Sequence, residues 1–488
     1  MNVNDDERNL FLAAEECPAN EFSKNHWFAA HDERLIKALM AHGPVLIRGG
    51  RGAGKSALMI EASRRLQSSE YAFAFYVSLR YLPLLETTGK EYIKHFVELT
   101  SKEISKALPP VLNFNIQDSI EDLKVALIDL SLKTNKRIVL LFDDAAHIGR
   151  EASLDEFFDM FRMISSAEIS CKASIYPGVT RFGNRFDVYN DATVLDITKD
   201  ERAENFNDFF FEVVKLRNEN LAEQFSQYKN LTAIEVSGFL GRTVLGNMRA
   251  FILALNRLDV QGKYEGITSL RTLLMSLSSD YFWPLLEEVT PKLGMYEPLA
   301  DVGVKIAEQL FAFAGEAKIP SIVIKREICQ SIAKPLEILE YVGFIAKREA
   351  SRSLRSGGRG PRYRLNLAML LENSPTKMLS NELVESWLKD HLEVVDIGLT
   401  NNPINVVVPE LDIGHSLSIF TVTVDKLLQS NAYPYGLTLD KVTRLQGANI
   451  NTVGELVRVD NAALDAIPGI GDVWVKRIKN VVMQAVWM

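Results

Sequence analysis

Hydrophobic and polar positions alternate in a regular way along the first two hundred residues of the chain. Apolar runs of strand length occur at residues 43–49, 71–79, 137–144, 171–177 and 192–197. The stretches 56–66, 90–108 and 119–133 carry apolar residues at intervals of three and four, which predicts helices. Strands that alternate with helices form a mostly parallel sheet that is covered on both faces. We therefore predict an α/β domain over residues 1–200.

The pattern changes beyond residue 200. Helical spacing continues to about residue 345, a glycine- and arginine-rich passage follows, and residues 372–434 show no clear pattern. A compact block runs from residue 435 to the end. The 488 residues correspond to about three domains of ~150 residues each. Several smaller units are therefore expected after the α/β domain.

The composition excludes several classes of protein. Apolar residues make up 47% and charged residues 24% of the chain, as in a folded globular protein. The longest aliphatic and aromatic run, Ile138–Phe142, is far shorter than the ~20 residues of a membrane span, and the acidic N-terminus is no secretory signal. Cys17, Cys171 and Cys329 lie too far apart for a disulfide framework or a metal-ligand motif. We expect a cytoplasmic protein with no membrane partner.

A glycine-rich loop follows the first predicted strand. Gly49–Ser56 reads GGRGAGKS and fits the pattern G-x-x-x-x-G-K-[ST] between a strand and a helix, which is typical of a phosphate-binding loop. Its backbone N–H groups can surround phosphate oxygens at the positive end of the helix. Lys55 would neutralise the β- and γ-phosphates, and the Ser56 hydroxyl would bind Mg²⁺. The predicted nucleotide contacts are Gly49, Gly50, Arg51, Gly52, Ala53, Gly54, Lys55, Ser56 and Ala57.

Two adjacent carboxylates end the most apolar predicted strand, RIVLLFDD. In a phosphate-loop enzyme, Asp143 would anchor Mg²⁺ through water, and Asp144 would orient the water that attacks the γ-phosphate. The alternative is a pair of carboxylates that caps an ordinary strand. The sequence thus predicts Lys55, Asp143 and Asp144 as catalytic residues, with Ser56 and Asp143 at the metal.

A further motif resembles the AAA+ ATPases, in particular their origin-recognition/initiator clade. GNMRAFILALNRL is similar to the start of their lid helix, whose arginine touches the γ-phosphate, and by this resemblance Arg249 is a fourth catalytic residue. The resemblance implies ATP as the nucleotide and Mg²⁺ as the cofactor. Residues 173–187 resemble the sensor-one strand and loop, in which Ser174 or Thr180 would be the polar sensor.

The loop within residues 173–187 and the pair Asp143-Asp144 each allow more than one interpretation. Arg181 or Arg185 would be an arginine finger offered to a neighbouring subunit, or would pair with surface acids. Most AAA+ proteins carry Asp-Glu where this chain has Asp143-Asp144, and the shorter aspartate predicts slow hydrolysis. Asp-Asp also resembles the STAND NTPases, which are signalling switches with a helical lid and a winged helix.

Residues 336–367 resemble the end of a winged-helix domain, in which two strands flank the hairpin tip RSGGRGP. From Lys347 to Arg364 the chain carries seven basic residues and one acid, although the whole chain has a net charge of −8. Such a local reversal favours contact with DNA phosphates or insertion into a minor groove. The alternatives are a solvated loop and a wing that docks on an acidic surface. The predicted DNA contacts here are Arg352, Arg355, Arg359 and Arg362.

The C-terminal block contains IPGIG between two helical patterns, which is the helix-hairpin-helix arrangement. Backbone N–H groups at such a turn can bind a DNA phosphate, and Lys476 and Arg477 follow on the next helix. About fifty residues are similar to the C-terminal domain of the RNA polymerase alpha subunit. Asp440 stands where that family has a DNA-binding arginine, and six basic residues face five acids from Leu437 onward. A protein-docking module is therefore an open alternative.

These motifs together predict a P-loop NTPase of the α/β class with four further parts. The predicted parts are an AAA+ nucleotide-binding domain (1–200), a helical lid with connecting helices (201–295), a winged-helix domain (296–371), a connecting segment of unknown fold (372–434) and a small all-α helix-hairpin-helix domain (435–488). We predict an ATPase whose nucleotide state controls binding to double-stranded DNA, with a homo-oligomer or a partner protein at the C-terminal domain. The alternatives are a STAND-type signalling switch and the ATPase subunit of a bacterial defence or transposition assembly that acts through protein partners.

Overall fold

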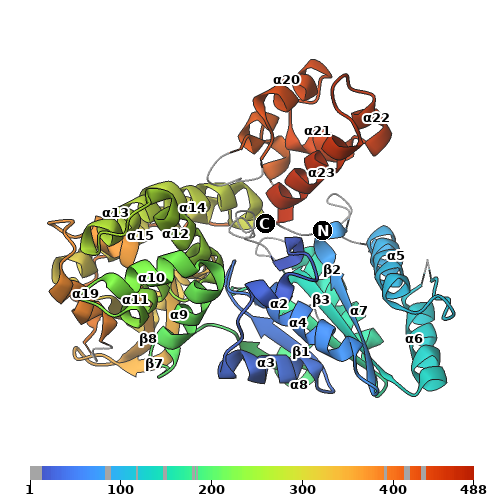
Figure 1. Ribbon diagram of the computed structural model, residues 1–488, viewed down its shortest axis with the longest axis horizontal. Helices are drawn as coiled ribbons and strands as arrows, with labels where there is room; N and C mark the ends of the chain where they lie inside the picture. Colours follow the sequence, from blue (N-terminus) through green and yellow to red (C-terminus); the bar gives the residue numbers. More distant parts are fainter. Residues whose placement is uncertain are drawn as a thin grey trace.

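The computed structural model of the chain describes residues 14–82, 89–116, 119–146, 151–178, 182, 185–389, 393–411, 418–429 and 436–487. Figure 1 shows a sheet with its helices in blue and cyan, a largely helical part from green to orange, and a small helical block in red above both. None of the helices within the described ranges combines the length and the apolar character that crossing a membrane requires. The candidate residues Thr180 and Arg181 lie outside these ranges.

The first part is built on a five-stranded parallel sheet with the strand order β2-β3-β4-β1-β5. Its strands are β1 (Val45–Arg48), β2 (Ala72–Ser78), β3 (Arg137–Ala146), β4 (Ile169–Ile175) and β5 (Thr193–Asp196). Its helices are η1 (Ala14–Glu16), α2 (Phe22–Asn25), α3 (Ala30–Met40), α4 (Lys55–Gln67), η2 (Leu79–Tyr81), α5 (Gly89–Ala107), α6 (Ile120–Thr134), α7 (Glu151–Ile164) and α8 (Val188–Asp191). The predicted parallel sheet of the α/β domain is confirmed.

Both faces of this sheet are buried, because successive side chains of a strand point to opposite sides. On β3, Leu140 and Phe142 pack in the cluster that contains residues of α5, α6 and α7, whereas Val139 and Leu141 pack with residues of α3 and α4. A parallel sheet that is covered on both faces has no polar face, which explains the continuous apolar runs. Polar chemistry is therefore left to the ends of the strands.

The second part is helical throughout and follows the sheet. It consists of α9 (Phe206–Arg217), α10 (Glu219–Gln227), α11 (Ala233–Thr243), α12 (Met248–Gln261), α13 (Ile267–Leu277), the π-helical turn η3 (Ser278–Phe282), α14 (Trp283–Val289), η4 (Thr290–Lys292) and η5 (Gly294–Tyr296). These helices share one hydrophobic cluster with the part that follows them. The region predicted as a lid is thus continuous in its packing with the region predicted as a winged helix.

The third part adds a four-stranded sheet with the order β7-β8-β6-β9. Its elements are α15 (Pro298–Ala317), β6 (Ser321–Ile324), α16 (Arg326–Ser331), α17 (Ala333–Val342), β7 (Ile345–Ser353), β8 (Arg359–Leu365), α18 (Leu367–Glu372), α19 (Asn381–Leu388) and β9 (Val395–Ile397). The two strands expected around the hairpin tip within residues 336–367 occur as the antiparallel pair β7 and β8. The segment without a clear sequence pattern supplies β9, which pairs in parallel with β6.

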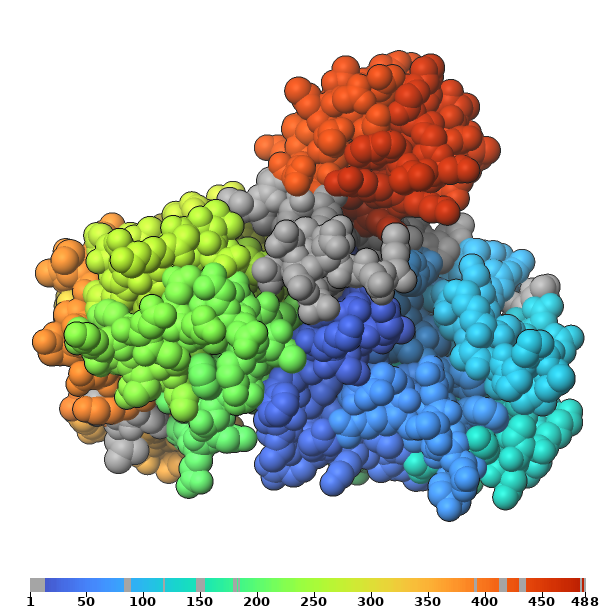
Figure 2. All heavy atoms as spheres, viewed as in Figure 1, coloured from blue at the N-terminus to red at the C-terminus, as the bar shows by residue number. Residues whose placement is uncertain are grey.

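The red block at the C-terminus stands above the junction of the other parts (Figure 2). It contains η6 (Ser418–Thr421), η7 (Val424–Leu427), α20 (Leu439–Gly447), α21 (Val453–Arg458), α22 (Asn461–Asp465) and α23 (Asp472–Trp487). The helix α23 contacts η2 beside the sheet, and η6 contacts η4 of the helical part. The block therefore touches both parts between which the glycine loop lies.

Candidate functional site

The glycine loop joins β1 to α4 and turns at two glycines. Gly52 and Gly54 have φ angles of 79° and 101°, in the left-handed region that residues with a Cβ rarely adopt. Gly54 is the N-cap of α4, which begins at Lys55. The positive end of the α4 dipole therefore points at the loop, as anion binding requires.

Lys55 is buried and folded back on its own loop. Its Nζ donates to the carbonyl oxygens of Gly49 at 2.8 Å and Gly50 at 3.1 Å, and it lies 3.5 Å from the centre of the Tyr176 ring. Burial lowers the pKa of Lys55, and the nearby carboxylates oppose this effect. Phosphate oxygens are stronger acceptors for an ammonium group than carbonyls are. Binding of a triphosphate would therefore exchange the carbonyl contacts for phosphate contacts.

Asp143 lies near the end of β3 and is held by three donors. The Tyr76 hydroxyl donates to its Oδ2 at 2.7 Å, and the Ser174 hydroxyl and the Asp144 N–H donate to its Oδ1 at 2.6 and 3.0 Å. The side chain is fully buried. These bonds fix the orientation of the carboxylate. The structure brings the sensor-one candidate Ser174 to the acid pair, and the other candidate, Thr180, lies outside the described residues.

Asp144 has an unusual backbone conformation and faces the loop. Its φ is 54°, a left-handed value that costs a non-glycine residue about 1–2 kcal/mol and persists only where the surroundings hold it. The Tyr176 hydroxyl lies 3.5 Å from its Oδ1. Burial, and then the charge of Asp143, raise the pKa of Asp144. Asp144 lines the same cavity as Lys55 and Ser56.

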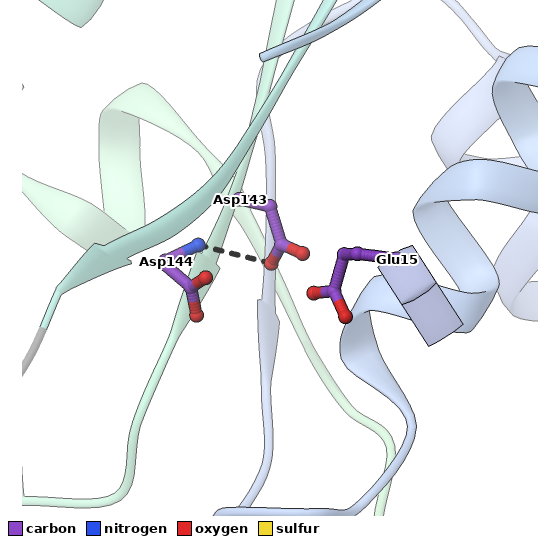
Figure 3. A group of neighbouring side chains, drawn as sticks. All are labelled: Glu15, Asp143 and Asp144. Carbon is purple, nitrogen blue, oxygen red and sulfur yellow. Dashed lines mark hydrogen bonds between the residues drawn. The ribbon is translucent and has the colours of Figure 1, made fainter. Parts of the chain in front are cut away.

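A third carboxylate reaches the acid pair from the N-terminal segment. Glu15, on η1, has an oxygen within 4.8 Å of carboxylate oxygens of Asp143 and Asp144 (Figure 3). Hydroxyl and carboxylate oxygens are the ligands that Mg²⁺ prefers, so Ser56 and Asp144 fit this cation. Asp143, which the sequence analysis placed at the metal, is held by three donors and does not line the cavity. The sequence analysis missed Glu15, because nothing in its local sequence marks it and Asp143 is far away along the chain.

The helix α12, which the sequence analysis assigns to a lid, begins directly on the glycine loop. Asn247 caps this helix by accepting the Ala250 N–H at 3.1 Å, and its side-chain amide donates to the carbonyl of Arg51 at 2.5 Å. The backbone N–H of Arg249 donates to the carbonyl of Gly52 at 3.1 Å. The Arg249 side chain lines the cavity beside the loop. The structure thus brings Arg249 to the glycine loop, and its role as a sensor stays a prediction.

Arg51 connects the loop to α14 of the helical part. Its guanidinium pairs with Glu288 of α14 at 3.2 Å, and Glu288 also accepts from Lys292 of η4 at 2.6 Å. Burial alone would raise the pKa of Glu288, but the charges of Arg51 and Lys292 lower it more. Removing one partner of such a buried pair costs about 3–5 kcal/mol. The loop and α14 are therefore held together by charge, a contact that the sequence did not reveal.

An apolar wall continues the cavity away from the loop. The N-terminal segment, α9 and α12 contribute His26, Trp27, Phe28, Phe209, Val213 and Ile252 to it. Aromatic and aliphatic side chains beside a phosphate site suit a planar base. The sequence analysis missed this wall, since its residues come from three separate segments and form no motif.

The basic passage of the β7–β8 hairpin divides into outward and inward residues. Arg355 and Arg359 at the tip are exposed, and Arg352 is half-buried. Arg362, expected among the DNA contacts, is 1% exposed, and its Nε lies 2.9 Å from Glu349. The strand β8 turns this side chain toward the protein, so Arg362 is not available for a direct DNA contact in this structure.

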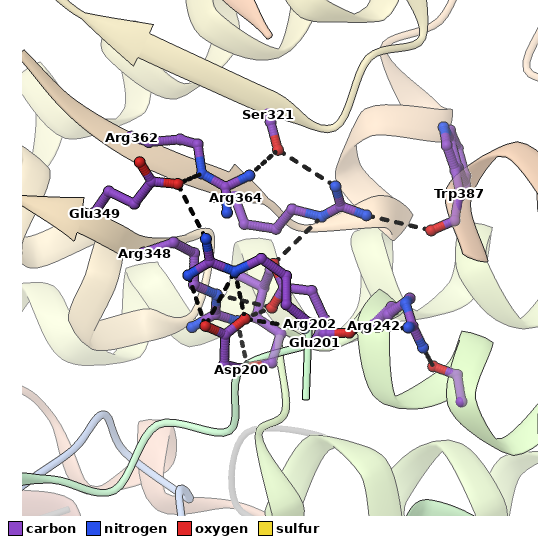
Figure 4. A network of polar contacts seen from close by, with 12 residues as sticks. Asp200, Glu201, Arg202, Arg242, Ser321, Arg348, Glu349, Arg362, Arg364 and Trp387 are labelled. Atoms are coloured by element: carbon purple, nitrogen blue, oxygen red, sulfur yellow. Dashed lines mark hydrogen bonds and ion pairs between the residues drawn. The ribbon is translucent and has the colours of Figure 1, made fainter. Parts of the chain in front are cut away.

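Glu201 holds two further arginines of the hairpin (Figure 4). One of its oxygens lies 2.7 Å from Arg348, and the other lies 3.8 Å from Arg364. Burial alone would raise the pKa of Glu201, but the two guanidinium groups lower it more. Glu201 lies between β5 and α9, where the sheet passes into the lid. The base of the hairpin is therefore docked on this joint.

The remaining charged candidates lie on the C-terminal block and in the loop that follows β4. Asp440 pairs with Lys441 and Arg444, each at 2.9 Å, so this helix presents little net charge. Lys476 and Arg477 are exposed on α23. The finger candidate Arg185 is also exposed.

The sequence matches no protein-family model and no curated protein. Solved structures that resemble the chain include a Walker-type ATPase of Pyrococcus abyssi, with 12% identity over 73% of this chain and 94% of that one and a TM-score of 0.41. Cdc6p of Pyrobaculum aerophilum gives 11% identity, 79% and 99% coverage and a TM-score of 0.36. A STAND protein of Pyrococcus horikoshii gives 15% identity, 74% and 44% coverage and a TM-score of 0.30. Similarity at this level does not establish what the chain binds.

The close approach of α12 to the loop predicts a specific effect of Gly52→Ala. A Cβ at this position would lie 2.6 Å from Oδ1 of Asn247 and 2.7 Å from Cβ of Arg249, in addition to the strain of a positive φ. Gly262→Ala is the matched control, because its φ is 83° and no atom lies within 4 Å of the added Cβ. We expect Gly52→Ala to lose about 1–3 kcal/mol more unfolding free energy than the control, measured by denaturant titration. Equal losses would contradict the contact.

The burial of His26 predicts a pH-dependent contribution to stability. Burial lowers the pKa of His26 to about 4, while its Nδ1–H donates to the carbonyl of Phe22 at 2.9 Å. Between pH ~6.5 and ~4 the unfolded chain binds a proton that the native ring does not, so stability falls as the pH falls. We expect wild type to lose about 2–3 kcal/mol more over this range than His26→Asn in urea unfolding. Parallel pH profiles would contradict this.

Proposed function

We propose that this chain binds ATP with Mg²⁺ beside the glycine loop and hydrolyses it slowly. The observation that carries the proposal is that Lys55, Asp144 and Arg249 come from three distant segments and line one cavity. Two basic side chains and a helix N-terminus can bind the phosphates of a triphosphate, and a carboxylate can bind its metal. The apolar wall next to them would hold the base, and adenine is the base that the AAA+ resemblance favours.

Each residue has a physical role in this proposal. Lys55 and Arg249 offset the negative charge that develops on the transferred phosphoryl group. Ser56 and Asp144 would hold Mg²⁺, which neutralises phosphate charge when bound. Tyr76 and other donors keep Asp143 in place behind them.

The nucleotide would act on the rest of the chain through the loop. The loop is close to α17 at Gly50, where an added Cβ would lie 3.6 Å from the carbonyl oxygen of Glu340. The ring of Tyr176, which lies beside Lys55, also contacts the ring of Tyr341, with 5.0 Å between the ring centres. Both Glu340 and Tyr341 lie on α17, which leads into the hairpin. A change in loop shape on binding ATP would therefore shift α17 and α12 together.

Double-stranded DNA is the partner that we propose for the exposed arginines. Arg355 and Arg359 are exposed at the hairpin tip, and Lys476 and Arg477 offer a second positive surface on α23. Exposed arginines of a hairpin tip suit phosphate contacts and shape readout more than base reading. A homo-oligomer that uses the exposed Arg185 belongs to the same proposal.

One observation favours a second candidate function, a signalling switch that acts on a protein partner. Arg348 and Arg362 of the hairpin form ion pairs with Glu201 and Glu349 of this chain. Basic side chains of the hairpin thus bind protein carboxylates, as they would on a protein partner. In that case the nucleotide would release or expose a protein surface and DNA would play no part. This is the STAND-type alternative, and the DNA experiment below separates the two.

Lys55→Ala tests nucleotide binding. We expect wild type to bind a fluorescent ATP analogue in the presence of Mg²⁺ and the variant to bind it at least about 100-fold more weakly, because a buried charge-assisted contact is lost. Competition by ATP should exceed competition by GTP. Lys133→Ala removes an exposed lysine of α6 and serves as the control. Equal affinities of wild type and Lys55→Ala would refute the site.

Neutralising the hairpin tip tests the DNA proposal. Arg355→Gln/Arg359→Gln should reduce the slope of log affinity against log salt by about two units and weaken duplex binding at low salt, because each arginine neutralises about one phosphate. Lys102→Gln/Lys133→Gln removes two exposed charges from α5 and α6 and should leave the slope unchanged. Fluorescence anisotropy with and without ATP measures both. Duplex binding that is absent, or unaffected by the tip substitutions, favours the protein-partner candidate.

A further inference from the structure

Three carboxylates converge at the end of β3, and their surroundings distinguish them. Asp143 is bonded to two hydroxyl groups and does not line the cavity. Asp144 lines the cavity from the side of the sheet. Glu15 enters from the other side, on η1 (Figure 3). Among the described residues, none is seen to donate a hydrogen bond to the Glu15 carboxylate, which lines the cavity together with Ser56.

The segment that carries Glu15 is anchored on the helix of the phosphate loop. The turn η1 packs against α4. Cys17 and Phe22 form a small buried cluster with Ala57, the residue that follows Ser56. The position of Glu15 is therefore fixed relative to the same backbone that would hold the phosphates, although its segment precedes the sheet.

Burial alone would lower the pKa of Arg80, but the charge of Glu15 raises it, so this guanidinium offsets part of the negative charge that the carboxylate brings to a phosphate site. Because none of the described residues donates a hydrogen bond to the Glu15 carboxylate, its oxygens can take part in a further interaction. The carboxylate can bind a cation or take a proton from water. Ser56 and Asp144 are the candidate cation ligands, and Glu15 lines the same cavity with its carboxylate within 4.8 Å of that of Asp144. We propose that Glu15 is the general base of the hydrolysis, a role that rests on the proposed ATPase function.

The step balances with groups that the site and the substrate supply. The Glu15 carboxylate takes a proton from water, and the water oxygen forms a bond to the γ-phosphorus. The bond between the γ-phosphorus and the β–γ bridging oxygen breaks, and its electron pair leaves with ADP. The proton on Glu15 then passes to inorganic phosphate or solvent, which restores the carboxylate.

Glu15→Gln tests this role in the full-length protein, because the amide keeps the shape of the side chain but cannot accept the proton. Hydrolysis is measured in single turnover, and binding of a non-hydrolysable ATP analogue is measured across a Mg²⁺ titration. We expect the rate to fall at least about 100-fold, while the analogue affinity and the Mg²⁺ concentration for half-maximal binding stay within about threefold. Glu15→Asp, which withdraws the carboxylate by one methylene, should give an intermediate rate. Glu70→Gln, at an exposed position before β2, should match wild type.

The other outcomes separate the inference from the proposed function. A Glu15→Gln variant that hydrolyses ATP at the wild-type rate or faster would overturn the assignment, the faster rate showing that Glu15 blocks the site. A raised Mg²⁺ requirement with an unchanged rate at saturating Mg²⁺ would overturn it in favour of a metal ligand. Wild type that binds the analogue without turnover would overturn the base but keep the nucleotide site. Wild type that does not bind the analogue would overturn both.

Discussion

The structure depends on the direct contact that two helices make with the backbone of the glycine loop at its glycine positions. The helix α12 and its cap bond to the loop at Gly52 and Arg51, and α17 approaches the loop at Gly50. A Cβ at Gly52 would collide with Asn247. The glycines that free N–H groups for phosphate therefore also allow two other elements to touch the loop. Ligand binding and the arrangement of the parts share the same few atoms of backbone.

The sheet and half of the site could be predicted because their signals are local. A strand buried on both faces must be apolar at every position, and β3 shows this directly. The loop needs glycines at fixed intervals, and a lid helix needs a cap such as Asn247. Each requirement acts within a dozen residues. Lys55 and Asp144 were found in this way, and Arg249 was found by its resemblance to the AAA+ lid helix; the structure brings all three to one cavity.

The other half of the site depends on contacts between distant segments. Glu15 and Glu288 lie in segments with no motif, and they reach the loop only through the packing of η1 and α14. The hairpin shows a second limit. Counting charges gives the net charge of a passage, but strand geometry decides which side chains face water, and it turns Arg362 inward. Pairing of β9 with β6 was equally hidden, because three residues carry no periodicity.

The buried Glu201 has a practical consequence for work with fragments. In the intact chain it neutralises Arg348 and helps to neutralise Arg364, and it lies outside the region of the hairpin. An excised piece that begins at α15 would leave these guanidinium groups without their acid. Such a piece would carry more positive charge on its surface than the same residues show in place. Its attraction to polyanions would therefore overstate that of the whole molecule.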